Sequence, residues 1–336
     1  MTFWSGKRVL VTGATGLVGS WLTKALVAGG AHVVALICDL DPQSELLRSG
    51  TLGRVVSVSG RLEDRSAVER AVNEHAVDTI FHLGAQTLVG TAFRSPVATF
   101  ESNVQGTWNV LEAARLHAGL VARVIVASSD KAYGDQPDLP YREDMPLEGR
   151  SPYDASKSCT DLLSQCYATS YGLPVAIARC GNIYGGGDLN WSRIVPGTTR
   201  SILRGEQPVI RSDGTLVRDY LHVDDVVDAY LLLGEALTAS SVAGEAFNFS
   251  DESPLSVLEM YEAVCSAVAG RHVEPEIQGH APGEIATQHL SAAKAREQLG
   301  WKAQVALDDG LSRTAQWYEG LIGAAAQFRR QDDRDG

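Results

Sequence analysis

Three glycines spaced three residues apart, Gly13, Gly16 and Gly19, directly follow a short apolar run at residues 8–11. The run predicts a buried strand, and the apolar periodicity of residues 17–28 predicts a helix that starts within the glycine segment. A tight turn between a strand and a helix leaves free backbone N–H groups and the positive end of the helix dipole at the turn. The chain is therefore expected to begin with a strand, a phosphate-binding turn and a helix.

Strand-like and helix-like segments then alternate through the first half of the chain. Further strands are predicted at residues 33–37, 54–58, 79–83, 123–127 and 175–178. Helices are predicted at about residues 64–75, 96–117 and 153–171. Strands that are apolar on both faces and separated by helices form a parallel sheet covered on both sides. We therefore predict an α/β fold with a Rossmann-type doubly wound parallel sheet.

The pattern changes after Arg179, where glycines and prolines punctuate shorter elements. This change predicts a smaller α/β substrate-binding lobe on the C-terminal side. We assign residues 1–180, with a return segment at about 215–240, to the cofactor-binding domain, and residues 181–214 and 241–325 to the lobe. The charged residues 326–336 are expected to form a frayed tail.

The composition excludes several classes of function. The net charge of −12 provides no attraction to nucleic acid or to an anionic membrane, and no apolar run reaches membrane-spanning length. The five cysteines are scattered without a Cys-x-x-Cys pair, so we expect neither a metal site nor disulfides. Reduced cysteines and an N-terminal segment without the apolar region of a signal peptide favour a cytoplasmic location.

The glycine segment is suited to a dinucleotide cofactor. Gly13 permits the tight turn, Gly16 lets the backbone approach a pyrophosphate, and Gly19 allows close packing of the helix. Asp39 lies about 20 residues further on, where an acid binds the adenosine ribose and favours NAD over NADP, but it could equally be a solvated turn residue. Arg61 leaves some room for a 2′-phosphate. The predicted cofactor contacts are Gly13, Thr15, Gly16, Leu17, Val18, Gly19, Asp39, Asp64, Leu83, Ala85, Tyr153 and Lys157.

Candidate catalytic residues follow the predicted strand 123–127. Tyr153 and Lys157 are four residues apart and share a helix face, where a cationic Lys157 would lower the pKa of the tyrosine. Tyr153 could then take a proton from a substrate hydroxyl oriented by Ser129 while a nicotinamide takes the hydride. Asp130 and Lys131 add a second acid and a second base, which oxidation alone does not need. The set predicts oxidation followed by elimination; a solvated turn with a local ion pair is the alternative for Asp130 and Lys131.

Six further segments share a pattern with one enzyme family. They are Phe81-His-Leu-Gly-Ala-Gln, Asn103-Val-Gln-Gly-Thr-Trp, Ser151-Pro-Tyr-Asp-Ala-Ser-Lys, Arg179-Cys-Gly-Asn-Ile-Tyr-Gly, Arg218-Asp-Tyr-Leu-His-Val and Leu299-Gly-Trp. Through them the chain resembles the nucleotide-sugar enzymes of the extended short-chain dehydrogenase/reductase family. Asp130-Lys131 and the Phe3-Trp4 opening resemble CDP-glucose 4,6-dehydratases. Those enzymes typically carry Arg-Pro-Trp-Gln-His-Val at the position of Arg218, so the nucleotide base stays open.

The resemblance implies an NAD-dependent nucleotide-sugar 4,6-dehydratase. Tyr153 would take the O4 proton as NAD takes the C4 hydride, and a neutral Lys131 would then take the C5 proton. A protonated Asp130 would donate to the departing C6 hydroxyl, and the hydride would return to C6. The net reaction would remove water without net oxidation.

The same resemblance implies how the substrate and a second subunit are bound. Arg218, assisted by Asn182 and Arg193, would hold the diphosphate of the nucleotide sugar. The helices 96–117 and 153–171 would form a homodimer interface. Two other functions remain open. One is an NAD-dependent nucleotide-sugar 4-epimerase, which would leave Asp130 and Lys131 unused, and the other is a catalytically silent NAD-binding protein of this fold.

Overall fold

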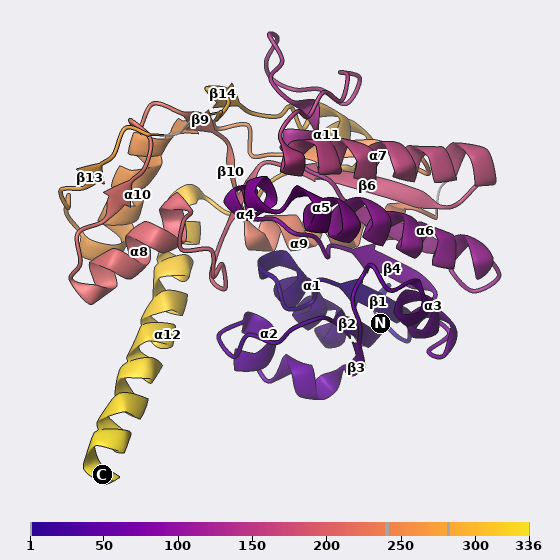
Figure 1. Cartoon of the computed structure of the whole chain (residues 1–336), viewed down its shortest axis with the longest axis horizontal. Helices are drawn as coiled ribbons and strands as arrows, with labels where there is room; N and C mark the ends of the chain where they lie inside the picture. The colour runs from indigo at the N-terminus through magenta and orange to yellow at the C-terminus, as the bar shows by residue number, and fades with distance from the viewer. Residues whose placement is uncertain (1, 239–241, 281–282, 336) are drawn as a thin grey trace.

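The computed structural model describes residues 2–238, 242–280 and 283–335. Within them, the largest sheet has seven parallel strands in the order β3-β2-β1-β4-β5-β6-β11 (Figure 1). The strands are β1 (Arg8–Thr12), β2 (His32–Ile37), β3 (Val56–Ser59), β4 (Thr79–His82), β5 (Arg123–Ala127), β6 (Val175–Cys180) and β11 (Ala246–Phe249). The strand order reverses between β1 and β4, as in a doubly wound sheet. The predicted Rossmann-type α/β fold is thereby confirmed.

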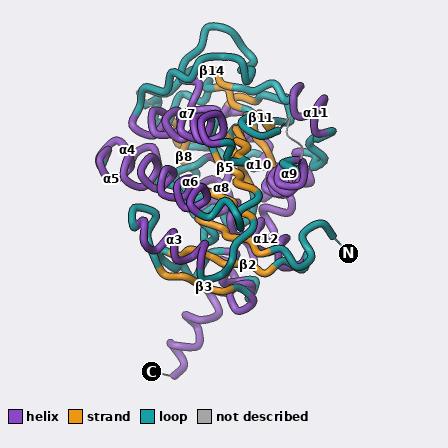
Figure 2. The backbone as a smooth tube through the Cα atoms, turned by 90° about the vertical axis from the view of Figure 1, so that its right-hand side faces the viewer, coloured by secondary structure: helices purple, strands orange, loops and turns teal. Residues whose placement is uncertain are grey.

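Helices cover both faces of this sheet. Val9 and Val11 of β1 pack in a core with α1 (Leu17–Ala28) and α9 (Val223–Ala236). Leu10, which points to the opposite face, packs in a second core with α3 (Arg65–Asn73), α6 (Gly106–Leu116) and α7 (Pro152–Tyr171). Figure 2 shows the strands between α6 and α7 on one side and α9 on the other. Strands buried on both faces explain the nearly continuous apolar runs in the sequence.

The helix predicted at residues 96–117 forms in three continuous pieces. They are α5 (Pro96–Phe100), a π-helical turn at Glu101–Gln105 and α6. The single wide turn shifts the helical register and carries Asn103, whose side chain is buried. Such π turns occur mostly as isolated turns within α-helices and frequently at functional sites.

The second lobe is built around α8 (Ile194–Arg204), α10 (Val257–Ala269) and the start of α12 (Leu307–Asp335), which pack on one another. Its short strands pair as β8 (Val209–Ile210) with β13 (Glu276–Ile277), and as β9 (Val217–Arg218) between β12 (Leu255–Ser256) and β14 (Thr287–Gln288). β7 (Asn182–Tyr184) pairs with β10 (Tyr220–His222) at the junction with the sheet domain. The remaining helices are α2 (Glu45–Arg48), α4 (Val89–Arg94) and α11 (Ala293–Leu299).

Two segments differ from the expected domain boundaries. β11 was expected in the lobe 241–325, but it pairs in parallel with β6 and extends the main sheet, because Phe247 and Phe249 bury apolar rings there. The residues 326–335 expected in a frayed tail belong to α12. Among the described residues, no helix combines the length and the apolar character needed to cross a bilayer.

Candidate active site

The predicted site residues follow strands that end at the same edge of the sheet. The glycine turn follows β1, Leu83 and Ala85 follow β4, and Ser129 follows β5. Parallel strands present their carboxyl ends together, and ligands of open α/β sheets bind at the point where the strand order reverses. That point lies here between β1 and β4, next to β5.

The glycine turn forms an open cradle. Gly13 has a φ of +71°, and a Cβ atom there would lie 2.7 Å from the backbone nitrogen of Gly84. A Cβ atom on Gly19 would lie 2.0 Å from the carbonyl oxygen of Gly13, so only glycine fits. Gly16 caps α1 without any side-chain hydrogen bond, which leaves the first N–H groups of the helix for an anion. The residues of this turn therefore fit the pyrophosphate of a dinucleotide.

The predicted adenosine end of the cofactor site contains a cation among acids. Asp39 is exposed just after β2, and Arg61 lies beside it. Nη2 of Arg61 contacts Oε1 of Glu63 at 3.2 Å, and Glu63 is the main cause that raises the pKa of the guanidinium, with Asp39 a small further contribution. Arg61 therefore stays charged in a solvent-exposed pair with Glu63, and the choice between NAD and a 2′-phosphorylated cofactor at this position stays a prediction.

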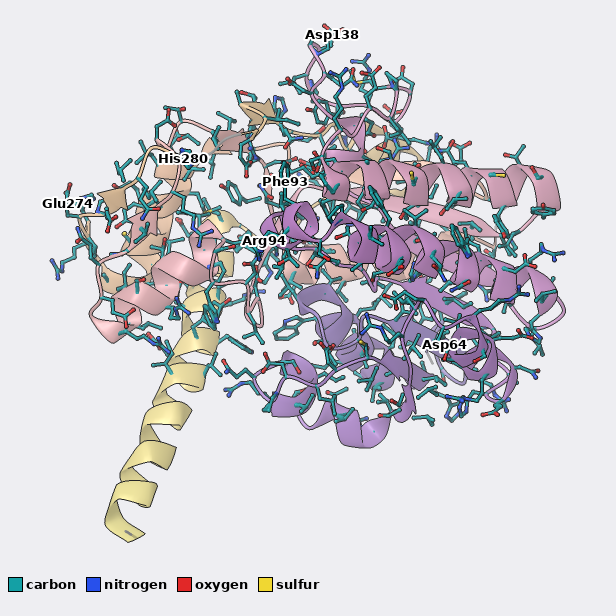
Figure 3. All side chains as sticks on the ribbon, viewed as in Figure 1. Asp64, Phe93, Arg94, Asp138, Glu274 and His280 are labelled. Carbon is teal, nitrogen blue, oxygen red and sulfur yellow. The ribbon has the colours of Figure 1, made fainter. Side chains whose placement is uncertain are left out.

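Asp64, predicted as a cofactor contact, caps the first turn of α3 (Figure 3). Its Oδ1 accepts hydrogen bonds from the backbone nitrogens of Ser66 at 2.9 Å and Ala67 at 3.2 Å. These bonds, together with one from the Ser66 hydroxyl, lower the pKa of the carboxyl. The carboxylate is therefore engaged with its own helix, and a contact with the cofactor stays a prediction.

Lys157, a further predicted catalytic residue, is held at the carboxyl end of β5. Its Nζ donates to the carbonyl oxygen of Ala127, at the end of β5, over 2.7 Å. Burial lowers the pKa of this amine to about 8. His82, held between Thr12 at 2.8 Å and Thr107 at 3.1 Å, has a pKa lowered to about 3 by burial and by the charge of Lys157. The histidine is therefore neutral, and Lys157 is the positively charged member of this pair.

The pKa of Tyr153 depends on its burial and on neighbouring groups. Burial raises the pKa of the phenol to about 12, and the cation that opposes this rise is Arg193, aided by a hydrogen bond with Ser129. Lys157, whose amine donates to the end of β5, is not among the main causes of this shift, and its effect on the phenol stays a prediction. A cationic ligand beside Tyr153 would be needed to make the phenol a base near neutral pH.

The predicted elimination pair stands on a short 3₁₀ turn, η3 (Asp130–Tyr133), directly after β5. Ser129 caps this turn: its hydroxyl donates to Oδ1 of Asp130 at 2.8 Å and accepts from the backbone nitrogen of Lys131 at 3.2 Å. Asp130 is only 2% exposed, and its Oδ2 has no partner among the described residues. Nζ of Lys131 donates to Oε1 of Gln288 on β14. The acid and the base thus lie at the sheet edge beside Tyr153.

A buried ion pair holds this turn against α7. Arg179 of β6 binds Asp161 of α7 through two hydrogen bonds of 2.7 and 2.9 Å. Its Nη1 also donates to the Tyr133 hydroxyl at 2.7 Å, which in turn donates to Oδ1 of Asn248 at 2.7 Å. The network was missed from the sequence, although Asp161 follows Lys157 by one helical turn on the same face. It fixes η3 and α7, and therefore Lys131 and Tyr153, relative to each other.

The predicted diphosphate ligands lie on β7, at the start of α8 and on β9. Arg218 is buried on β9, where Nη1 donates to the carbonyl oxygen of Val217 at 2.7 Å and Nη2 pairs with Glu284 at 3.0 Å. Arg193 pairs with Asp188 at 3.0 Å. Asn182 is partly buried at the start of β7. A diphosphate at Arg218 would therefore have to replace the carboxylate of Glu284.

Asp219, next to Arg218, is a site feature that the sequence analysis did not identify. Its Oδ2 accepts from the Ser250 hydroxyl at 2.5 Å and from the backbone nitrogen of Leu290 at 3.1 Å. Burial, and secondarily the charge of Asp130, raise the pKa of this carboxyl to about 7. Its Oδ1 has no partner among the described residues. Asp130 and Asp219 are therefore two buried carboxyl groups, and each has one oxygen without a hydrogen-bond partner among the described residues.

Comparison with known proteins agrees with this geometry. The sequence model of the family described as GDP-mannose 4,6 dehydratase matches residues 10–314. The CDP-glucose 4,6-dehydratase of Salmonella typhimurium is 30% identical over 335 residues, which cover 95% of this chain and 92% of that protein. The UDP-glucose 4-epimerase of Mycolicibacterium smegmatis is 33% identical over 314 residues, which cover 93% and 98%.

A solved structure extends the likeness to three dimensions. The dTDP-glucose 4,6-dehydratase of Streptomyces venezuelae, crystallised with NAD bound, superposes with a TM-score of 0.84 at 30% identity. The match covers 94% of this chain and 98% of that one. The chain therefore belongs to the GDP-mannose 4,6 dehydratase family, a group of nucleotide-sugar dehydratases among the extended short-chain dehydrogenases/reductases.

Proposed function

We propose that the protein is an NAD-dependent nucleotide-sugar 4,6-dehydratase with a CDP-glucose-like substrate. The observation that carries the proposal is the Asp130–Lys131 pair on η3, beside Ser129 and Tyr153. Oxidation at C4 uses one base, whereas elimination across C5 and C6 also uses a base for the C5 proton and an acid for the leaving hydroxyl. The relative that uses CDP-glucose, at 30% identity, supports the choice of nucleotide.

Each proposed catalytic residue would carry out one step of the reaction. NAD, held at the glycine turn, would supply a reversible hydride acceptor and a positive charge beside Tyr153. Tyr153 would take the proton of the sugar O4, with Ser129 orienting that hydroxyl. Lys131 would take the C5 proton, and Asp130 would give a proton to the departing C6 hydroxyl. The hydride would return to C6 and a proton to C5, so the products would be water and an NDP-4-keto-6-deoxyhexose.

The second lobe would supply the main contact to the diphosphate of the substrate. Arg218 would bind the diphosphate with two N–H groups after Glu284 is displaced, and Arg193 and Asn182 would add contacts. Because Arg218 is buried, its charge needs a partner in both states, first the carboxylate and then the phosphate. Exchange of one anion for another keeps the guanidinium paired.

A nucleotide-sugar 4-epimerase is the second candidate, supported by the epimerase relative at 33% identity. An epimerase would use Tyr153 and a ketone intermediate that rotates in the site, so that the hydride returns to the other face of C4. It would leave Asp130 and Lys131 without a role. The two functions predict different products from the same substrate.

The test is incubation of the protein with CDP-, dTDP-, UDP- and GDP-hexoses, followed by mass spectrometry. We expect loss of one water, about 18 mass units, which needs the paired acid and base. An unchanged mass with inverted C4 would reject dehydration in favour of epimerisation. Lys131→Met should abolish water loss while absorbance of reduced nicotinamide still reports C4 oxidation. A fully active Lys131→Met variant would remove the proposed role of this lysine.

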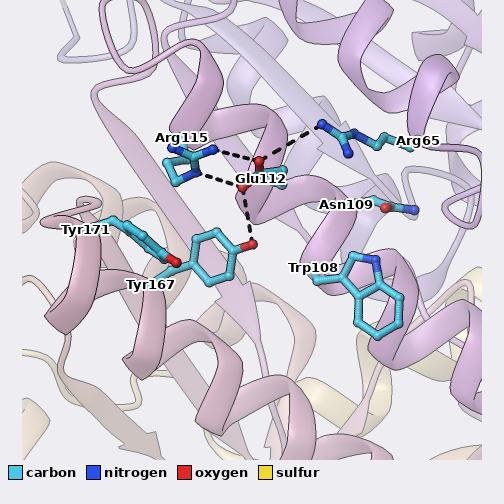
Figure 4. Close-up of a pocket in the computed structure, with 7 residues that line it drawn as sticks. All are labelled: Arg65, Trp108, Asn109, Glu112, Arg115, Tyr167 and Tyr171. Carbon is cyan, nitrogen blue, oxygen red and sulfur yellow. Dashed lines mark hydrogen bonds and ion pairs between the residues drawn. The ribbon is translucent and has the colours of Figure 1, made fainter.

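We also propose a homodimer formed through the outer faces of α5, α6 and α7, which lie side by side (Figure 1). Large apolar side chains are exposed there: Val97, Phe100, Trp108, Leu116, Leu162 and Tyr171. Between α6 and α7 lies a hollow of about 470 Å³ with Trp108 and Tyr171 at its wall (Figure 4). It contains none of the predicted catalytic residues. Light scattering should give the mass of a dimer for the wild type and of a monomer for Leu162→Glu.

A further inference from the structure

Lys131 contacts a residue from the second half of the chain. Its Nζ donates to Oε1 of Gln288, which lies 157 residues further along the sequence, on β14. Gln288 is fully buried, and its Nε2 has no hydrogen-bond partner within residues 2–238, 242–280 and 283–335. A buried amide that makes only one of its hydrogen bonds is costly, so its position calls for a physical reason.

Backbone contacts on both sides fix the position of Gln288. In the pairing of β14 with β9, Gln288 lies opposite Arg218. The backbone of the next two residues is bound as well, since His289 accepts from the nitrogen of Tyr141 at 2.9 Å and Leu290 donates to Asp219 at 3.1 Å. A side chain on such a segment has little freedom, so it is able to orient the amine that it contacts.

Charged and titratable groups lie around the turn that carries Lys131. Asp130, the residue before Lys131, acts on Tyr141, Tyr153 and Asp154, and Glu284 also acts on Asp154. The charge of Lys131 acts on Asp154 of α7. The hydrogen-bond partner of the amine is nevertheless the uncharged amide. A carboxylate in that place would favour the ammonium form, whereas an amide oxygen accepts an N–H without adding a negative charge.

We propose that Gln288 is a positioning residue for Lys131, which orients its amine toward the substrate and lets it act as a neutral base. The catalytic consequence rests on the proposed function, in which Lys131 takes the C5 proton. Since β14 is paired with β9, the partner of the base and the arginine that would bind the diphosphate are held by adjacent strands. Binding of the diphosphate and alignment of the base would thus depend on one pair of strands.

The first test needs neither substrate nor turnover. Gln288→Glu keeps the shape of the side chain but places a carboxylate beside the amine. Acetic anhydride reacts only with neutral amines, so acetylation of Lys131, followed by peptide mass spectrometry against pH, reports its protonation. We expect the variant to require a pH higher by about one unit or more for half-reaction. The same pH for wild type and variant would overturn the proposal, whatever reaction the enzyme catalyses.

The control is Gln278→Glu, since Gln278 is exposed and hydrogen-bonds Glu276 far from Lys131. This control should leave the acetylation of Lys131 unchanged. Gln288→Met serves as the second variant if Gln288→Glu does not fold, because it removes the carbonyl oxygen without adding a charge. Gln288→Met should leave the amine of Lys131 without its orienting partner, and the fall in kcat described below measures this loss.

The second test uses turnover. For Gln288→Glu and Gln288→Met we expect kcat of elimination to fall about 100-fold, the usual contribution of a placed general base, while KM changes less than about threefold. Reduced nicotinamide should still form from C4 oxidation. An unchanged kcat in both variants would overturn the positioning role. If the wild type eliminates water from none of the nucleotide sugars, the proposed function fails, and the acetylation experiment still decides the contact of Gln288 with Lys131.

Discussion

Replacement of Asp219 by asparagine should make the protein less sensitive to alkaline pH. The carboxyl is 2% exposed and its pKa is raised from 3.8 to about 7, first by burial and then by Asp130. Because the folded state binds this proton more tightly than the unfolded state, the full stability is present below pH 4 and is lost as pH rises through about 7. Asparagine keeps the shape and the acceptor oxygen for Ser250 and Leu290 but never ionises.

The size of the effect follows from the shift. One pKa unit corresponds to about 1.4 kcal/mol, so a carboxyl moved from 3.8 to about 7 lowers the free energy of unfolding by about 4 kcal/mol once ionised. At pH 5 only the unfolded chain is ionised to any extent, and the loss is about 2 kcal/mol. The advantage of Asp219→Asn over the wild type should therefore grow by about 2–3 kcal/mol between pH 5 and pH 8.

Urea denaturation followed by tryptophan fluorescence at pH 5, 6, 7 and 8 measures this advantage. The control is Asp138→Asn, because Asp138 lies at the tip of an exposed loop (Figure 3). The free energy of unfolding of Asp138→Asn relative to the wild type should not change between pH 5 and pH 8. If the gap between Asp219→Asn and the wild type stays constant from pH 5 to pH 8, the carboxyl does not titrate in that range, and the account of its burial is wrong.

Three further predictions concern other buried groups. Arg179→Met leaves Asp161 buried without its cation and should cost about 3–5 kcal/mol in urea denaturation; a cost below about 1 kcal/mol would show that the pair is not needed. Gly19→Ala places a Cβ atom 2.0 Å from the carbonyl of Gly13 and should weaken NAD binding at least about tenfold by calorimetry, whereas Gly53→Ala, in open space, should not. His82 has a folded-state pKa of about 3 against 6.5, so stability should fall as pH drops below 6.5. His82→Gln should reduce that fall by a few kcal/mol, and an equal fall in both proteins would contradict the assignment.

The local segments were accessible from the sequence. The strand, glycine turn and helix of residues 8–28, the strand 123–127 and the helix that carries Tyr153 and Lys157 each show their periodicity within a short window. The alternation of such windows determines a doubly wound sheet, and that sheet brings the carboxyl ends of its strands together. The predicted positions of Ser129, Asp130 and Lys131 at one of these ends followed from that rule alone.

The contacts between distant segments depended on tertiary packing. β11 joins the sheet beside β6, Gln288 reaches Lys131, and Glu284 neutralises Arg218, although none of these pairs is close in the sequence. The protonation of the site has the same origin, because burial sets the pKa of Tyr153 and of Asp219 far more than their sequence neighbours do. Periodicity is a property of neighbouring residues, whereas desolvation and the pairing of charges are properties of the packed interior. The amino-acid sequence therefore determined the sheet and the residues at its edge, and the packing of the second lobe against that edge decided which partner and which charge each of them has.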